Sequence, residues 1–191
     1  YWRVPHVTEG GHVFELRTQL RADVYSVEEV ATTTTGGAPD NYNGVTGRVI
    51  PEVWLDWRYP LLKRLPNASL IIEPTAQLVA GVNGLDSNTI PNEDSLALEF
   101  SDSNLFAANH YPGYDLVESG TRVNYGIRSQ LHFDGGSHIH FLFGQNYHTD
   151  NNNLFPYSND LDEEMSDYVG RLAWNYTNAL QLAYRFRLDQ Q

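Results

Sequence analysis

The sequence predicts an all-β fold: an antiparallel transmembrane β-barrel wall segment of about seven strands, with short periplasmic turns and long extracellular loops. Three observations predict it. Apolar and polar residues alternate along several runs, and the connections between these runs alternate between long and short. The composition combines 13% aromatic residues with a mean hydropathy of −0.45, as expected where lumen and loops are polar and the membrane interfaces are aromatic.

The alternating runs have the two-residue period of a strand with one apolar and one polar face. In the first run, Phe14, Leu16 and Leu20 share one face, and Glu15 and Arg17 share the other. Runs of about 9–14 residues suit tilted strands that cross a membrane. The expected strands are residues 12–25, 48–59, 69–82, 122–134, 138–148, 168–176 and 180–188.

The connections between these runs alternate strictly in length, which is the topology of outer-membrane barrels. A soluble sandwich has no reason to separate its loops by length. The first strand is therefore expected to run outward from the periplasm. Residues 26–47, 83–121 and 149–167 are the long connections, and residues 60–68, 134–137 and 177–179 are the short ones.

Two prolines and the number of strands add further expectations. Pro51 and Pro74 each remove a hydrogen bond from a strand, so we expect a bulge or a loosened pairing there. Seven strands cannot close a single-chain bacterial barrel, which has an even number. We therefore expect residues 1–191 to be part of a larger barrel. A brief alternation at residues 96–100 predicts a small strand within the second outer loop.

Composition and missing motifs exclude several classes of function. The 24 acidic and 12 basic residues give a net charge of −12, which argues against a nucleic-acid partner. No apolar run approaches the roughly 20 residues of a membrane-spanning helix. The absence of cysteine excludes disulfides and thiolate metal sites from this segment. No G-x-S-x-G, P-loop or H-E-x-x-H motif is present, so we expect neither an enzyme nor a cofactor.

Histidines and acidic residues form two candidate cation sites. His132, His138, His140 and His148 lie on one face of neighbouring strands, which would suit a divalent metal. We favour the interpretation that they are polar lumen residues and expect no metal. The acidic loop around Leu161 lacks the ordered ligand spacing of an EF-hand, so we interpret it as a solvated loop in weak contact with divalent cations at most. Its acids are Asp160, Asp162, Glu163, Glu164 and Asp167.

A ladder of arginines lies on the polar faces of the expected strands, interleaved with acidic residues. The favoured interpretation is a lumen wall of cross-strand ion pairs. The functional alternative is a set of guanidinium contacts for phosphates of a passing glycolipid or for a plug protein. The candidate lumen-facing binding residues are Arg122, Arg128, Arg171, Arg185 and Arg187.

Several motifs follow one another in a specific order. The chain reads I-E-P-T-A-Q-L at 72–78, N-E-D-S at 92–95, S-N-L-F at 103–106, Y-P-G-Y-D at 111–115 and G-T-R-V-N-Y-G at 120–126. G-Q-N-Y at 144–147 and D-Y-V-G at 167–170 come later. Through these motifs, from about residue 48 to residue 189, the chain resembles the lipopolysaccharide-assembly family LptD, also called organic solvent tolerance protein.

The resemblance implies a translocon in the outer membrane of a Gram-negative bacterium that assembles lipopolysaccharide into the outer leaflet. It implies a large barrel plugged by the lipoprotein LptE, with outer-membrane lipid around it. It also implies an N-terminal periplasmic jellyroll, absent from this chain, that meets the LptA bridge. The segment resembles the middle to later barrel, so no lateral-gate residue is assigned to it. Transport energy would come from an inner-membrane ATPase, so no nucleotide site is expected.

Two other classes stay open at this point. A passive porin-type outer-membrane channel would have the same wall chemistry and a constriction loop folded into its lumen. A soluble β-sandwich that binds or hydrolyses carbohydrate would bury Leu172, Trp174, Leu182 and Phe186 beneath a second layer. The translocon should instead co-purify with a lipoprotein.

Overall fold

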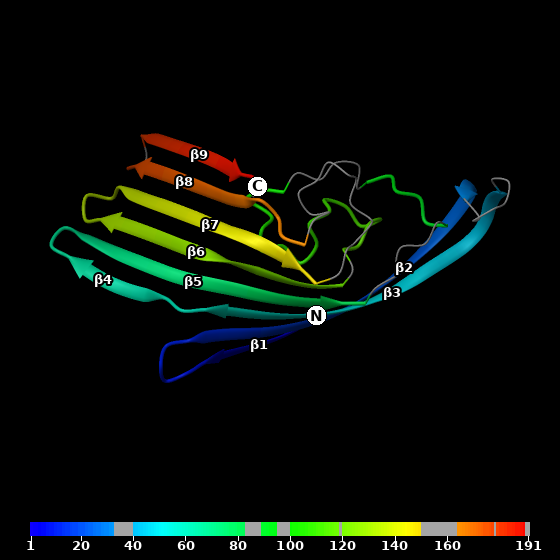
Figure 1. Cartoon of the computed structure of the whole chain (residues 1–191), viewed down its shortest axis with the longest axis horizontal. Helices are drawn as coiled ribbons and strands as arrows, with labels where there is room; N and C mark the ends of the chain where they lie inside the picture. Colours follow the sequence, from blue (N-terminus) through cyan, green and yellow to red (C-terminus); the bar gives the residue numbers. More distant parts are fainter. Residues whose placement is uncertain are drawn as a thin grey trace.

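The described part of the chain is one antiparallel sheet of nine strands (Figure 1). The computed structural model describes residues 1–32, 40–82, 89–94, 100–118, 120–149, 164–177 and 179–189. None of these residues forms a helix long and apolar enough to cross a membrane. The strands are β1 (Trp2–Val7), β2 (Val13–Thr32), β3 (Asp40–Arg58), β4 (Leu61–Leu65), β5 (Ala68–Gly81), β6 (Thr121–Phe133), β7 (His138–His148), β8 (Tyr168–Tyr176) and β9 (Leu180–Leu188).

The all-β antiparallel prediction is confirmed, but the predicted number of strands was wrong. β7, β8 and β9 have the expected bounds, and β5 and β6 differ from them by one residue at each end. β1 and β4 were not expected, and the nine strands are again an odd number, so the expectation that the chain is part of a larger barrel stays a prediction. Neighbouring strands pair in the order β1-β2-β3-β5-β6-β7-β8-β9, and β4 pairs with β5. Within the described residues the sheet is open, with β1 and β9 at its two ends.

β2 and β3 replace most of the first expected outer loop. They have 20 and 19 residues and extend past the ends of the other strands (Figure 1). Their register shifts between Val27 and Val30, where Glu29 adopts a positive φ of 56°. This irregularity interrupts the two-residue period, which is why the sequence pattern ends near residue 25 although the strand continues.

Both strand prolines lie where the regular pairing with one neighbouring strand stops, although the Pro74 carbonyl still accepts a hydrogen bond from Tyr59 N–H at 3.0 Å. Pro74 of β5 faces the break between β3 and β4 at Tyr59 and Pro60, and Pro51 of β3 lies beyond the last pair between β3 and β5. Each proline stays in register with its other neighbour, β6 or β2, so of the two expected alternatives the bulge is not formed. The expected loosening is present, because pairing on one side of each proline is interrupted.

The two faces of the sheet differ in chemistry and in burial. The apolar face carries exposed side chains such as Leu20 (72%), Leu172 (45%) and Leu182 (52%). On the polar face, Gln77 and Asn124 are almost completely buried. A soluble sheet protein has the opposite arrangement, with its apolar face covered.

Residues 100–118, here called the inner segment, cover part of the polar face (Figure 1). Their apolar side chains Phe100, Leu105 and Tyr111 form a small core with Val169 of β8. Leu105 rests on Gly144 of β7, where an added Cβ would lie only 2.7 Å from Leu105 Cδ2. Glycine is therefore required for this close approach. The small strand predicted at residues 96–100 falls almost entirely outside the described residues.

Candidate functional site

A buried polar cluster fixes the end of the inner segment to β6 and β7. The Glu118 carboxylate lies 2.6 Å from His110 Nδ1, 3.1 Å from His148 Nε2 and 3.4 Å from Arg122 Nη2. All four side chains are at most 3% exposed. Arg122 also donates a hydrogen bond to the backbone carbonyl of Ala108 in the inner segment. The cluster thus joins β6 and β7 to the inner segment both at residues 108–110 and at Glu118.

The charge of Glu118 is stabilised within this cluster. Its complete burial alone would raise the pKa of the carboxyl group. The guanidinium of Arg122 and the contacts with His110 and His148 outweigh burial and hold the Glu118 pKa well below its ordinary value. Glu118 is therefore a buried carboxylate at neutral pH, and Arg122 is its counter-ion.

Two arginines attach the inner segment to the other side of the sheet. Arg48 of β3 donates to the carbonyls of Asp115, at 2.6 Å, and of Tyr114, and Arg21 of β2 donates to the Tyr114 carbonyl at 2.9 Å. Both guanidinium groups also lie 2.9 Å from the carboxylate of Asp23. Backbone carbonyls and one carboxylate are the partners of these two arginines, although the buried Nε of Arg21 has no partner among the described residues.

Further ion pairs extend the attachment to β9. Arg185 Nε lies 3.2 Å from Asp102 Oδ1 of the inner segment, and Arg187 Nε lies 3.5 Å from Asp167 Oδ2, just before β8. The inner segment therefore crosses the polar face from β2 and β3 to β9. The described residues leave the part of this face toward the short turns uncovered.

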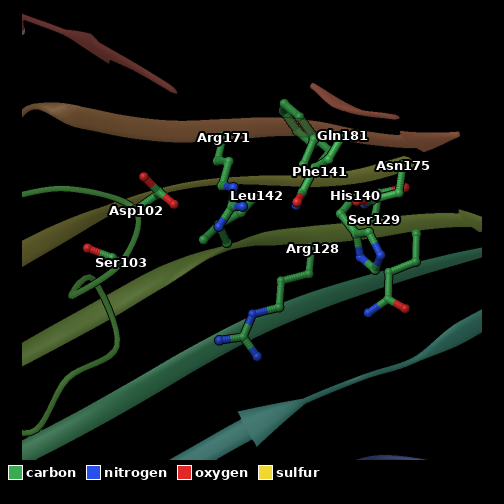
Figure 2. Close-up of a pocket in the computed structure, with 12 residues that line it drawn as sticks. Asp102, Ser103, Arg128, Ser129, His140, Phe141, Leu142, Arg171, Asn175 and Gln181 are labelled. Carbon is green, nitrogen blue, oxygen red and sulfur yellow. The ribbon is translucent and has the colours of Figure 1, made fainter. Parts of the chain in front are cut away.

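A groove of about 430 Å³ occupies the uncovered part of the polar face (Figure 2). Asp102 and Ser103 of the inner segment lie at one end, and the side chains of β6–β9 form its floor and walls. This cavity is hereafter called the groove. Its lining residues are Asp102, Ser103, Arg128, Ser129, Gln130, His140, Phe141, Leu142, Arg171, Ala173, Asn175 and Gln181.

The strand register arranges the groove in rows of different chemistry. Arg128, Leu142, Arg171 and Arg185 face one another across β6, β7, β8 and β9, and form a cationic row next to the inner segment. The following rows toward the turns, across β6 to β9, contain no Asp, Glu, Lys or Arg. They contain Gln130, His140 and Ala173, and then His132, His138, Asn175 and Gln181.

The arginines of the cationic row differ in their partners. Arg128 Nη1 lies 3.7 Å from Glu73 Oε1, and its guanidinium carbon lies 4.7 Å above the ring of Phe106. Arg185 pairs with Asp102, as described above. Among the described residues, no carboxylate lies within ion-pairing distance of Arg171, and its buried Nε has no hydrogen-bond partner.

The comparisons with known proteins identify a family. The sequence model of the family described as LPS transport system D, LptD, matches residues 1–191. The chain belongs to the LptD family. The resemblance inferred from the motifs is thereby confirmed, and the chain has a role in lipopolysaccharide transport. A comparison with curated proteins gives no match.

In this LptD chain, the five candidate binding arginines have different environments. Arg128 and Arg171 line the groove, whereas Arg185 and Arg187 lie at the edge of the sheet with acidic partners. Arg122 is 1% exposed beneath the inner segment. Their common role as binding residues stays a prediction.

Sequence reasoning missed the Glu118 cluster and the two amides Asn175 and Gln181. Alternation places residues on a face, but it does not show which loop covers that face. His110 and Glu118 lie in a segment without periodicity. The only available signal was the absence of basic residues between Leu65 and Thr121, which leaves the acids of this loop to pair with arginines of the strands.

The predicted histidine group is present as a cluster. The ring centroids of His132, His138 and His140 are 4.9–5.9 Å apart, and His148 belongs to the Glu118 cluster instead. Among the described residues, no three His, Cys, Asp or Glu side chains are arranged to hold a metal ion. The acidic loop around Leu161 lies mostly outside the described residues.

Proposed function

We propose that this chain forms part of the wall of an outer-membrane lipopolysaccharide translocon in a Gram-negative bacterium. Its apolar face contacts the hydrocarbon of the membrane, and its polar face lines the lumen. Further strands beyond β1 and β9 close the barrel. Lipopolysaccharide passes along the lumen and enters the outer leaflet.

The observation that carries this proposal is the inverted burial of the two faces. Leu172, Trp174 and Leu182 are exposed on the apolar face, where a soluble sandwich would cover them. Phe186 lies with them and stacks on Phe143, with ring centroids 6.3 Å apart. Exposed apolar side chains on neighbouring strands are the pattern of a sheet that faces lipid.

The proposed partners follow from the family. LptE would occupy the lumen as a plug, and the LptA bridge would deliver lipopolysaccharide through an N-terminal periplasmic jellyroll outside this chain. The inner segment leaves the polar face toward the short turns open for such contacts. The proposal contains no reaction step and therefore no cofactor.

A passive porin-type channel is the second candidate, and one observation favours it. The inner segment folds onto the polar face, as a porin constriction loop would. The same loop suits a translocon, in which it would restrict free diffusion while lipopolysaccharide passes. Membership of a lipopolysaccharide-transport family favours the translocon.

In-cell crosslinking distinguishes the two candidates. A photoreactive amino acid is placed in the full-length protein at Gln130 of the polar face or at Leu172 of the apolar face. The translocon predicts capture of lipopolysaccharide at Gln130 during active transport, loss of this capture when the inner-membrane ATPase is depleted, and co-purification of a lipoprotein. A porin predicts neither ATPase-dependent capture nor a lipoprotein. Lipopolysaccharide captured only at Leu172 would overturn the assignment of the lumen face.

A further inference from the structure

We infer that the groove is a binding subsite for the phosphorylated saccharide part of lipopolysaccharide. Arg171 and Arg128 contact a phosphate, and the amide and imidazole side chains of the neighbouring rows contact saccharide hydroxyls. The inference rests on the proposed function, because the polar face must line the path of the glycolipid. It separates Arg128 and Arg171, which line the groove, from the three candidate arginines that lie outside it.

The first argument is the distribution of counter-ions. Arg122 is closed off by Glu118, and Arg185 and Arg187 are paired with Asp102 and Asp167. Arg171 has no such carboxylate among the described residues, although its Nε is buried. Arg21 and Arg122 also have a buried Nε without a partner, but both have a carboxylate beside them. An anion in the groove would give the guanidinium group of Arg171 the counter-ion that it lacks among the described residues.

The second argument is the cost of the cationic row itself. Arg171 and Arg185 are direct cross-strand neighbours, and Arg128 follows on the other side of Leu142. Like charges directly opposite each other destabilise a sheet. Asp102 and Glu73 offset the charges of Arg185 and Arg128, whereas Arg171, between them, has no carboxylate beside it among the described residues. The planar guanidinium group matches two oxygens of a phosphate, and two such groups on one side of a groove favour phosphate over an uncharged ligand.

The third argument is the chemistry of the remaining lining. Gln130, His140, Asn175 and Gln181 supply hydrogen-bond donors and acceptors, and the small side chain of Ala173 leaves the floor open between them. Amides and imidazoles suit hydroxyl groups, whereas an acyl chain would leave these polar groups without partners. A saccharide joined to a phosphate fits both parts of the groove.

The test uses the full-length protein in cells with a photoreactive amino acid at Gln181, inside the groove. Tyr184, on the apolar face of the same strand, is the control position. Capture of lipopolysaccharide at Gln181 is then compared among Arg171→Gln, Arg171→Lys and Arg58→Gln, per assembled barrel. Arg58 is the matched control because it is an exposed arginine of the polar face outside the groove.

The expected result is a fall in capture of about ten- to a hundredfold for Arg171→Gln, the usual size of one lost charge-assisted contact. Arg171→Lys falls less, because it keeps the charge without the planar fork. Arg58→Gln stays within about twofold. Equal capture in Arg171→Gln and Arg58→Gln would overturn the subsite but leave the proposed function standing. Failure of Arg171→Gln to assemble would also overturn it, because Arg171 would then be structural.

Loss of capture at every polar-face position, including Gln181 and Gln130, would instead refute the proposed function itself. A competition experiment on the purified full-length complex tests the ligand class. A monosaccharide phosphate should reduce capture at Gln181 at lower concentration than inorganic phosphate, and the same monosaccharide without phosphate should have no effect. Equal competition by inorganic phosphate would reduce the subsite to an anion site without saccharide recognition and overturn the inference in this form.

Discussion

Replacing Glu118 by glutamine should release the inner segment from the polar face. The substitution keeps the shape of the side chain but removes the carboxylate that contacts Arg122, His110 and His148. Arg122 would then be a buried cation without a counter-ion. Breaking a buried ion pair in this way costs about 3–5 kcal/mol. Because the amide keeps some hydrogen bonds, we expect a value near the lower end, about 3 kcal/mol.

A change of this size raises the population with a released inner segment by about two orders of magnitude. The measurement is the labelling rate of a cysteine introduced at Val117, which is 3% exposed and similar to cysteine in volume. Residues 1–191 contain no cysteine, so the introduced thiol is the only labelling site within them. Labelling that follows rare opening reports the open population directly.

Glu93→Gln is the matched control, because Glu93 is an exposed acid of the same connection. It should leave the labelling rate at position 117 unchanged. If Glu118→Gln and Glu93→Gln give the same rate, the cluster does not hold the inner segment and the reasoning above is refuted.

Three further predictions follow from the same structure. The folded pKa of Glu118 lies below its ordinary value of 4.5, so its stabilisation of the inner segment is complete above pH 4.5 and is lost as the pH falls further. Hydrogen exchange in residues 100–118, corrected for intrinsic rates, should therefore be constant from pH 8 to 5 and increase below about pH 4.5. Constant protection down to pH 3 would contradict this. Tyr184→Arg should destabilise the barrel by about 2–4 kcal/mol because it places a charge against hydrocarbon, whereas Ala183→Arg on the polar face should not; equal amounts of assembled protein would count against the lipid-facing assignment. Gly170→Ala should cost about 1–3 kcal/mol, since the new Cβ would lie 2.3 Å from Phe186 Cζ, and Phe186→Leu should restore part of the urea-unfolding midpoint.

The strands that could be located from the sequence alone are those with one apolar face and one polar face. β7, β8 and β9 alternate along most of their length, with exceptions such as Leu142 on the polar face, and their ends coincide with polar or glycine-containing turns. β4 has the sequence Leu-Leu-Lys-Arg-Leu, which has no two-residue period. It forms a strand because β5 continues beside it, and such a non-local pairing leaves no local pattern.

The site was predicted only in part, for a related reason. Alternation correctly placed Arg128 and Arg171 on the polar face, because the period of a strand determines the face. It gave Arg122 the same description, although Arg122 is sealed beneath the inner segment. Which arginines are covered depends on how an aperiodic loop folds back, and that depends on contacts such as Leu105 against Gly144. No pattern within one strand contains this information.

The β2–β3 hairpin extends past the other strands, so the length of its outer part can be changed without altering the rest of the sheet. Its outer pairs, such as Tyr25–Thr46 and Ser26–Val45, have no third strand beside them, so their register depends only on each other. Removing two successive pairs would lower the tip by roughly 7 Å and leave each remaining side chain on its original side. Removing a single pair would lower the tip by half as much, but every side chain between the deletion and the tip would move to the opposite face of the hairpin. Viable length variants of this hairpin should therefore differ by even numbers of residues in each arm.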